Sequence, residues 1–530
     1  MRYSDIAVKV DMNDIACLPN PNLKAYLSQN VAGYDVVIRS PFGKGESVDS
    51  MLSEWISILE SELVEDRYTS LLQFERDKAS KVGPMSVRLP LRERLDDIVN
   101  YYESVVNVDA YEPIDGNAIR SYIQEVRRLV GGMHPKSIDE TVWRMKKSTN
   151  GGLPTFQKRR ELIPLIKSSR LTRDAQYWDG RWYKTAAVLG WRGQEGGPNP
   201  SDVKQRVVFM FPMLVNVHEL RVYQTLIEAY QKARLVPAWI SNDYVDNIIT
   251  KLFDTKGDDD LVITTDFTKF DQHFNAHCQA AARSILQSLF TGLDEWLDLV
   301  YPIKYDIPLL NRWGEITIGS HGMGSGSGGT NADETLVHSV LQRECAKMAG
   351  SQLNPYSMCL GDDGIISFPG CSVESVTNSY TRHGLDMNLE KQYYSTDDCV
   401  YLQRWHSKHY RVEGICAGVY ATCRALGRLC YQERYYDPEY WGREAVAMRQ
   451  LSIIENIKWH PLREKFADYC MKRDIYRLGL DIPGFIDQID ATWWNLNDHI
   501  QDFLSYSTMA GMSITPPSKW WITSYLKSKA

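Results

Sequence analysis

The sequence lacks the patterns that mark several large classes of protein. It has no run of about 18 apolar residues, the length needed to cross a bilayer, so we expect no membrane-spanning helix and no membrane partner. We also expect no targeting segment, because Met1 to Val10 alternates charged and apolar residues. The 10 cysteines include no Cys-x-x-Cys pair, which argues against a zinc ribbon and predicts the reduced thiols of a cytoplasmic protein.

An overall excess of positive charge is also missing. The net charge of −7 argues against a general nucleic-acid coat protein. The charge is unevenly distributed, however, because residues 144–206 hold 14 Lys and Arg against 5 Asp and Glu, a local charge of +9. Glycine and proline cluster in the same segment and favour loops over long helices. Basic side chains on such loops are suited to binding a polyanion.

At 530 residues with 43% hydrophobic content, the chain exceeds what one hydrophobic core usually serves, so we expect two to four subdomains. Residues 1–140 show helical patterning, as in Val48 to Leu63, and carry nothing that can be assigned to chemistry. From about Val412 onward the pattern is mainly helical and rich in Tyr and Trp.

The middle of the chain predicts short strands that end in acidic or glycine-rich turns. A β-branched run, Leu261 to Thr265, precedes a helical pattern that includes Ala281 to Phe290. A strand at Ile316 to Ile318, a glycine cluster and a helix from about Ala332 to Met348 follow. The apolar runs on either side of Gly361 to Gly364 then predict a hairpin.

Carboxylates stand at the ends of these strands. Asp266 follows the first strand, and Asp362 and Asp363 occupy the hairpin turn. Phosphoryl transfer from a nucleoside triphosphate uses two cations roughly 4 Å apart, and hard cations of that kind take carboxylate oxygens. Asp266, Asp362 and Asp363 are therefore the predicted ligands of two Mg²⁺ or Mn²⁺ ions.

A second Gly-Asp-Asp, at Gly257 to Asp259, lies between Lys256 and Asp260 in a wholly polar stretch. Met358 to Leu360 and Ile365 to Ile366 bracket the later copy with apolar side chains. We therefore expect the earlier copy to be a surface turn without a catalytic role.

The glycine cluster permits a rival interpretation. Gly324-x-Gly326-x-x-Gly329 matches the dinucleotide-binding fingerprint and would make the protein a nicotinamide-dependent oxidoreductase. Against this, the next strand continues as a hairpin, and the fingerprint leaves Asp266 and the basic segment unexplained. A non-catalytic RNA-binding virion protein is the alternative outside the enzymes.

The order and spacing of these pieces resemble the motifs of viral RNA-dependent RNA polymerases, most closely those of picobirnaviruses. The resemblance covers about residues 148–405. Its motifs are Asp266 to Asp271 (A), Ser325-Gly326 with Thr330 and Asn331 (B), Gly361-Asp362-Asp363 (C), Gly384 to Lys391 (D), Leu402 to Trp405 (E), Lys204-x-Arg206 (F) and Thr149 to Pro154 (G).

The resemblance implies an α/β (α+β) right-hand architecture with fingers, an antiparallel-sheet palm and a mainly helical thumb. The implied reaction is template-directed RNA synthesis from ribonucleoside triphosphates, for replication and transcription of a double-stranded RNA genome. The implied divisions are residues 1–140 (N-terminal extension and outer fingers), 141–255 (fingers with basic loops), 256–271 (palm), 272–320 (fingers), 321–411 (palm) and 412–530 (thumb and C-terminal tail).

The resemblance also implies roles for single residues. The implied catalytic residues are Asp266, Asp362, Asp363 and Lys391. The implied nucleotide-binding residues are Lys204, Arg206, Asp271, Ser325, Thr330 and Asn331. The residues implied to contact template and primer are Gly151, Gly152, Pro154, Gly326 and Arg404. One departure is Glu334, which stands where related polymerases often have Asn, so the resemblance leaves two candidates for the residue that reads the sugar, Asn331 and Glu334. Expected partners are RNA template, product duplex and ribonucleoside triphosphates, with a viral capsid protein as a further candidate. The expected locations are the virion and the host cytoplasm.

The tail from about Gly484 holds two Trp pairs, at 493–494 and 520–521. Large apolar rings favour packing against the rest of the protein. We further hypothesise that truncation before Gly511 alters how synthesis starts, through rings that stack on the first nucleotide pair.

Overall fold

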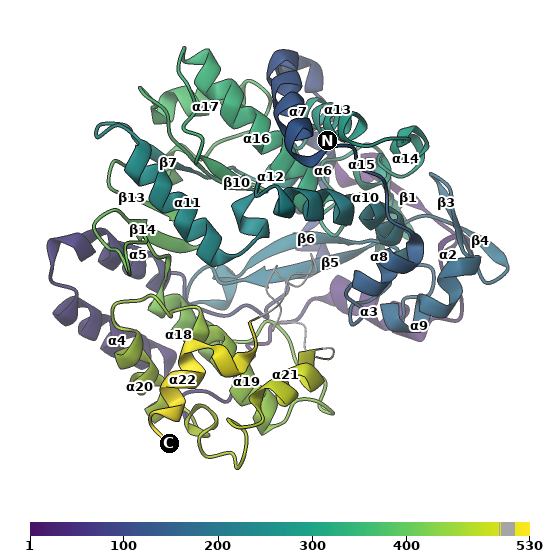
Figure 1. Cartoon of the computed structure of the whole chain (residues 1–530). Coiled ribbons are helices and arrows are strands. Elements are labelled where there is room, and N and C mark those ends of the chain that lie inside the picture. Colours follow the sequence, from purple (N-terminus) through teal and green to yellow (C-terminus); the bar gives the residue numbers. More distant parts are fainter. Residues whose placement is uncertain (498, 500–514) are drawn as a thin grey trace. The chain divides into compact units, whose positions relative to one another are not determined.

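A computed structural model describes residues 1–497, 499 and 515–530. The chain forms two compact units (Figure 1). The first unit consists of residues 1–33, 89–192 and 206–399, and the second of residues 34–88, 193–205 and 400–530.

The sheet that carries the acidic motifs lies in the first unit and has the strand order β10-β11-β7-β12. The strands are β7 (Val262–Thr265), β10 (Met358–Leu360), β11 (Asp363–Ile366) and β12 (Tyr393–Ser395). Each pairs antiparallel with its neighbour. The predicted strand after Leu261, the hairpin and the antiparallel sheet are therefore confirmed.

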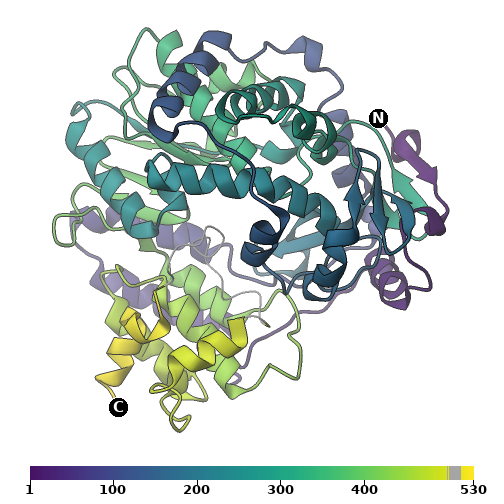
Figure 2. The same ribbon diagram turned by 45° about the vertical axis from the view of Figure 1, so that its right-hand side comes forward.

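Helix α16 (Thr330–Met348) packs against β10 and against helices α13 (Ala276–Leu289), α17 (Val373–Thr381) and α7 (Gly116–Val130). It is buried on nearly every side, which is why its sequence shows a weak amphipathic pattern. The predicted helix is confirmed, and it begins directly after the glycine cluster. The elements of this unit outside its first 33 residues run from blue to green in Figures 1 and 2.

A second sheet of the first unit has the order β1-β9-β8-β5-β6. Its strands are β1 (Ala7–Lys9), β5 (Ala187–Gln194), β6 (Lys204–Met210), β8 (Leu309–Arg312) and β9 (Glu315–Thr317). The strand before the glycine cluster, β9, pairs antiparallel with β1 and β8. It therefore belongs to a different sheet from Asp362, whereas a dinucleotide-binding unit needs parallel strands of one sheet around the glycine turn. This geometry contradicts the oxidoreductase interpretation.

The basic segment holds more regular structure than its glycines and prolines predict. A small sheet of β2 (Arg170–Leu171), β3 (Ala175–Trp178) and β4 (Arg181–Lys184) precedes β5. The remaining α-helices of this unit are α1 (Tyr3–Ile6), α2 (Met12–Ile15), α3 (Pro21–Ala32), α6 (Leu95–Glu103), α8 (Ile138–Arg144), α9 (Arg159–Leu162), α10 (Met213–Lys232), α11 (Asn242–Thr255), α12 (Phe270–His273), α14 (Asp294–Leu299) and α15 (Ile303–Asp306).

The second unit is mainly helical, as predicted for the chain beyond Val412. Its helices are α4 (Val48–Glu62), α5 (Thr69–Ala79), α18 (Thr422–Cys430), α19 (Arg443–Glu455), α20 (Arg463–Arg473), α21 (Ile489–Asn497) and α22 (Trp521–Lys527). A sheet of β13 (Asp398–Tyr401), β14 (Arg404–Ser407) and β15 (Val419–Tyr420) completes it.

Residues 34–88 pack with this C-terminal part rather than with the rest of the predicted segment 1–140. The reason is the apolar face of α4, where Met51, Trp55 and Leu59 are fully buried in one core with α18. Helix α5 packs on α18 as well. A boundary read from local patterning does not reveal such a contact between distant segments.

A buried carboxylate, Glu75, joins three elements of the second unit. It accepts hydrogen bonds from Thr422 N–H (2.8 Å), the Thr422 hydroxyl (2.7 Å) and Cys423 N–H (3.0 Å), all at the start of α18. His460 Nε2 lies 2.8 Å from the same carboxylate. Burial alone would raise the pKa of Glu75, but the His460 contact and the backbone donors outweigh it and hold the pKa below its usual value.

The tail packs back on the second unit, as predicted. Trp493 and Trp520 are buried and meet edge to face at 5.5 Å between ring centroids. The Glu455 carboxylate accepts the N–H groups of Trp521 (3.1 Å) and Ile522 (3.0 Å), which holds the start of α22. Two of the four rings are thus core, while Trp494 is exposed. The truncation point at Gly511 lies outside the described residues.

Among the described residues, no helix combines the length and apolar character that a membrane crossing requires. All 10 cysteines are free thiols, and only Cys17 is exposed.

Candidate active site

Asp266 and the Gly361-Asp362-Asp363 turn lie at one edge of the four-stranded sheet. β7 ends at Thr265, which pairs with Gly364 of β11, and Asp363 pairs with Leu360 across the hairpin. Because β7 and β11 are antiparallel, the residue after Thr265 and the residues before Gly364 leave the sheet at the same edge. The structure therefore places all three predicted aspartates at the same edge of the sheet, with Asp266 and Asp362 close enough to interact electrostatically.

Gln392 fixes the backbone that carries Asp266. Its Oε1 accepts a hydrogen bond from Asp266 N–H (3.2 Å), and its Nε2 donates to the Asp266 carbonyl (2.8 Å). Nothing in the sequence singles out this glutamine, because its partner is a backbone distant in the chain.

His338 of α16 packs against the hairpin turn and forms a hydrogen bond with its backbone. Its Nδ1 donates to the Gly361 carbonyl at 2.8 Å, and burial lowers its pKa to about 4, so the imidazole is neutral at pH 7. A Cβ on Gly364 would lie 2.6 Å from Cε1 of His338 and 2.8 Å from Oγ1 of Thr265. Glycine is therefore required at this position by close packing.

Asp362 lies in an acidic environment. Its side chain is exposed, but desolvation of the carboxyl by the surrounding protein raises its pKa, and the charges of Asp271 and Asp266 raise it further, while Arg206 opposes them. The pKa of Glu334 is raised well above its usual value, first by burial and then by Asp271 and Asp362. These carboxyls destabilise one another's ionised forms, which is the condition that a bound cation relieves.

The donor set fits hard divalent cations, because the converging groups are carboxylate oxygens. Among the described residues, however, no three carboxylate, imidazole or thiolate groups form a ready-made metal cage. Mg²⁺ commonly binds through one or two carboxylates and takes its other ligands from water and substrate phosphates.

Asp271 and Ser325 lie together beside this cluster. The Ser325 hydroxyl donates to Oδ2 of Asp271, and the Tyr101 hydroxyl lies 3.4 Å from Oγ of Ser325. Burial, with the Asp271 charge, raises the pKa of Tyr101, so the phenol stays neutral. Two of the predicted nucleotide-binding residues therefore form one hydrogen-bonded unit.

Thr330 and Asn331 face other partners. The Thr330 hydroxyl donates to the Gly324 and Ser327 carbonyls at 3.4 and 3.3 Å. Asn331 Oδ1 accepts a hydrogen bond from the Trp239 indole at 2.8 Å, and its Nδ2 is directed toward Gly361. Thr330 therefore holds the glycine loop, and Asn331 lies next to the acidic turn.

The glycine loop is attached to strand β6. Phe209 N–H donates to the Ser325 carbonyl at 2.8 Å, and a Cβ on Gly326 would lie 2.0 Å from the Phe209 carbonyl oxygen. Gly326 has φ +127°, a conformation that other residues rarely adopt. Lys204 and Arg206 are both exposed and alternate along β6, so they share one face of the strand as predicted.

The predicted template residues Gly151, Gly152 and Pro154 form a buried turn in which the Leu153–Pro154 bond is cis. A Cβ on Gly152 would lie 2.6 Å from the Phe211 carbonyl oxygen. These residues shape the turn rather than project from it. Arg404 is buried in β14, where its guanidinium packs against Gly418.

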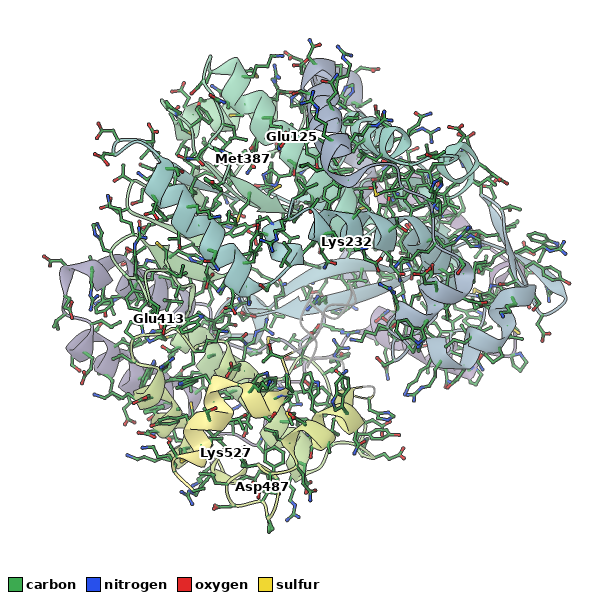
Figure 3. All side chains as sticks on the ribbon, viewed as in Figure 1. Glu125, Lys232, Met387, Glu413, Asp487 and Lys527 are labelled. Carbon is green, nitrogen blue, oxygen red and sulfur yellow. The ribbon has the colours of Figure 1, made fainter. Side chains whose placement is uncertain are left out.

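Lys391 is exposed at the end of the short turn Leu389–Lys391. The chain before it is joined to motif A by an isolated β-bridge between Phe267 and Met387 and by a 3.2 Å hydrogen bond from Asn388 N–H to the Asp266 carbonyl. Met387 is labelled in Figure 3. The earlier Gly257 to Asp259 copy forms an exposed turn, as predicted.

Comparison with known proteins agrees with this geometry. A family model described as "Viral RNA-dependent RNA polymerase" matches residues 84–414. A human picobirnavirus protein named "Potential RNA-dependent RNA polymerase" is 52% identical over 525 residues, which are 97% of each chain. Two crystal structures of a human picobirnavirus RNA-dependent RNA polymerase, one of them an insertion-loop deletion mutant, match with 50% identity, TM-scores of 0.92 and 0.91, and coverage of 99% of this chain and 100% of theirs.

Proposed function

The chain belongs to the viral RNA-dependent RNA polymerases, and from that premise we propose that it joins ribonucleotides by a two-metal mechanism in which Asp266, Asp362 and Asp363 hold the cations. The observation that supports this most directly is the common sheet edge, where Thr265 pairs with Gly364. When bound, the cations activate the attacking 3′ hydroxyl and neutralise the leaving pyrophosphate.

We propose that Asp271 and Ser325 recognise the ribose of the incoming nucleotide. The Ser325 hydroxyl already donates to Asp271, so the carboxylate is oriented before substrate arrives. Its free lone pairs accept a hydrogen bond from the 2′ hydroxyl, the group that distinguishes ribonucleotide from deoxyribonucleotide. Asn331 adds an amide donor near the acidic turn, and Thr330 maintains the loop.

We propose that Arg206, with Lys204 on the same face of β6, binds the triphosphate. Arg206 is exposed, and its positive charge acts on Asp362, so it lies within electrostatic range of the acidic turn. Lys391 is proposed to protonate the leaving pyrophosphate. The template entrance is proposed to be shaped by Gly151, Gly152 and Pro154. Gly326 is proposed to shape the loop beside the template base, and Arg404 to support the strand that carries the primer end.

The wider setting follows from the relatives, which are human picobirnavirus polymerases. We propose that the enzyme copies a double-stranded RNA genome, acts in the virion and host cytoplasm, and associates with a capsid protein. RNA template, product duplex and ribonucleoside triphosphates are the partners that the activity requires.

The test is a radiolabelled nucleotide incorporation assay on an RNA template. We expect incorporation that requires Mg²⁺ or Mn²⁺ and stops when a chelator removes them. Incorporation that persists unchanged in chelator would contradict the metal mechanism. Binding of RNA without incorporation under any metal would favour the virion-protein alternative.

A further inference from the structure

Glu219 is a fully buried carboxylate outside all seven motifs, and it forms hydrogen bonds with the glycine loop. Its Oε2 accepts a hydrogen bond from the Ser327 hydroxyl, and its Oε1 accepts the Gly328 N–H at 3.1 Å. It comes from α10, and the same helix places Leu220 so close to Gly328 that an added Cβ would lie 3.0 Å from it. The loop is thus bound to α10 by hydrogen bonds to a carboxyl group and not by apolar contact alone.

Asn216, one helical turn earlier on α10, extends this contact. Its Nδ2 donates to Oε1 of Glu219 at 3.2 Å and lies 3.3 Å from the Gly326 carbonyl. Glu219 and Asn216 together therefore bind three successive loop residues, 326 to 328. The next residue toward the N-terminus is Ser325, which orients Asp271.

The other end of Asn216 contacts the template-entrance segment. Arg159 donates to Asn216 Oδ1 at 2.8 Å, and its own N–H donates to the Thr149 carbonyl at 2.9 Å. Burial lowers the pKa of Arg159 to about 10 while the Glu219 charge opposes this shift, so the guanidinium remains charged at pH 7. The Asn216 amide is therefore aligned by a guanidinium donor at its oxygen and a carboxyl acceptor at its nitrogen.

We propose that Glu219 and Asn216 are positioning residues for nucleotide selection, and that the chain Arg159–Asn216–Glu219 couples the template-entrance segment to the loop that carries Ser325. The three side chains are linked by hydrogen bonds, from Arg159 to Asn216 and from Asn216 to Glu219. A shift at Thr149 to Arg159 on template binding therefore changes the orientation of the Asn216 amide and the seating of the loop. This inference rests on the proposed sugar-reading role of Asp271 and Ser325.

The test compares Glu219→Gln with Glu344→Gln, a matched change at another buried carboxylate of the first unit that is held by Arg382 and His383. The measurements are kcat and KM for a ribonucleotide and its 2′-deoxy analogue, together with the melting temperature. We expect Glu219→Gln to reduce ribose-over-deoxyribose selectivity at least fivefold, mainly through KM, because a glutamine cannot accept from both Ser327 and Gly328 as the carboxylate does. Glu344→Gln is expected to lower the melting temperature without changing selectivity.

Two further variants keep the proposal testable if Glu219→Gln folds poorly. Ser327→Ala removes two hydrogen bonds of a partly exposed loop residue, one donated to Glu219 and one accepted from Gly329 N–H, and is expected to act in the same direction, about twofold. Asn216→Ala is expected to reduce selectivity as well, and the double variant Asn216→Ala/Glu219→Gln should be no worse than the more severe single one, because both break one chain.

Parallel changes in melting temperature with unchanged selectivity in every variant would show that Glu219 is only structural. Wild-type protein that fails to incorporate nucleotides would overturn the proposed function and this inference together. Wild-type activity with unaltered selectivity in Glu219→Gln and Ser327→Ala would overturn the inference alone.

Discussion

Carboxylates in the two units differ in what surrounds them, whether they are buried, as Glu75 and Glu334 are, or exposed, as Asp362 is. In the second unit, Glu75 is matched by His460 and by the N–H groups at the start of α18, and its pKa is lowered. In the first unit, Glu334 and Asp362 have raised pKa values, to which other carboxylates contribute. The charge of Glu75 is balanced by groups of the protein itself. The carboxylates around Asp362 are not balanced in this way and leave negative charge for a cation to offset.

Burial alone does not make this difference. Asp474 and Glu455 of the second unit also have raised pKa values, caused by burial. The described groups that act on them most strongly after burial are hydrogen-bond donors and cations, which lower the pKa, and include no carboxylate. Mutual repulsion among carboxylates is therefore what distinguishes the candidate active site from structural acids.

The largest expected effect comes from Asp362→Asn. The amide keeps the shape but loses the charge that holds a cation, so we expect incorporation below about a tenth of the wild-type rate. The melting temperature should stay equal or rise, because repulsion with Asp271 is removed. Activity above that level, measured under the same metal concentrations, would place the metal site elsewhere.

Replacing Lys204 and Arg206 by Ala is expected to raise the nucleotide KM about tenfold, roughly the value of one charge-assisted contact, with template affinity unchanged. The Arg206 change has a second consequence. Because Arg206 lowers the pKa of Asp362, its loss moves the acidic limb of the pH–rate profile to higher pH. Lost template affinity at an unchanged nucleotide KM would reverse the assignment.

Glu75→Gln tests the carboxylate whose charge is balanced by groups of the protein itself. We expect a loss of about 1–3 kcal/mol of unfolding free energy at pH 7, with nucleotide KM unchanged. Because the pKa of Glu75 is lowered in the fold, its stabilising contribution is present above the ordinary value of 4.5 and disappears as pH falls through the lowered pKa. The difference from wild type in urea unfolding should therefore shrink below about pH 4.5, and a difference independent of pH would contradict this account.

The smallest expected effect comes from Asp259→Asn. The earlier Gly-Asp-Asp is an exposed polar turn, closed by a 3.1 Å hydrogen bond from Asp260 N–H to the Gly257 carbonyl. We expect incorporation and melting temperature to equal those of wild type within error. A measurable loss of activity would show that sequence context is a poor guide to which copy is catalytic.

The chain's local patterns were sufficient to predict the strand before Asp266, the hairpin around Asp362 and the helix after the glycine loop. Alternation, apolar flanks and turn residues act over a few positions, so a sequence read alone reveals them. The order of the motifs was sufficient to identify the family, which the relatives confirm. The roles of single residues, such as Lys391, remain predictions.

Other features depend on segments far apart in the chain. The sequence did not predict that residues 34–88 pack with the C-terminal helices. The same holds for His338 beneath the Gly361 turn and Glu219 behind the glycine loop.

The amino-acid sequence by itself determined where the acidic turns and glycine loop occur and which reaction they suit. Only the tertiary structure decided which buried acids are compensated and which are not. The physical reason is that the pKa of a buried carboxyl depends on every charge and donor within a few ångströms. Those neighbours are supplied by the packing of elements such as α10, α16 and β11, which lie far apart in the chain.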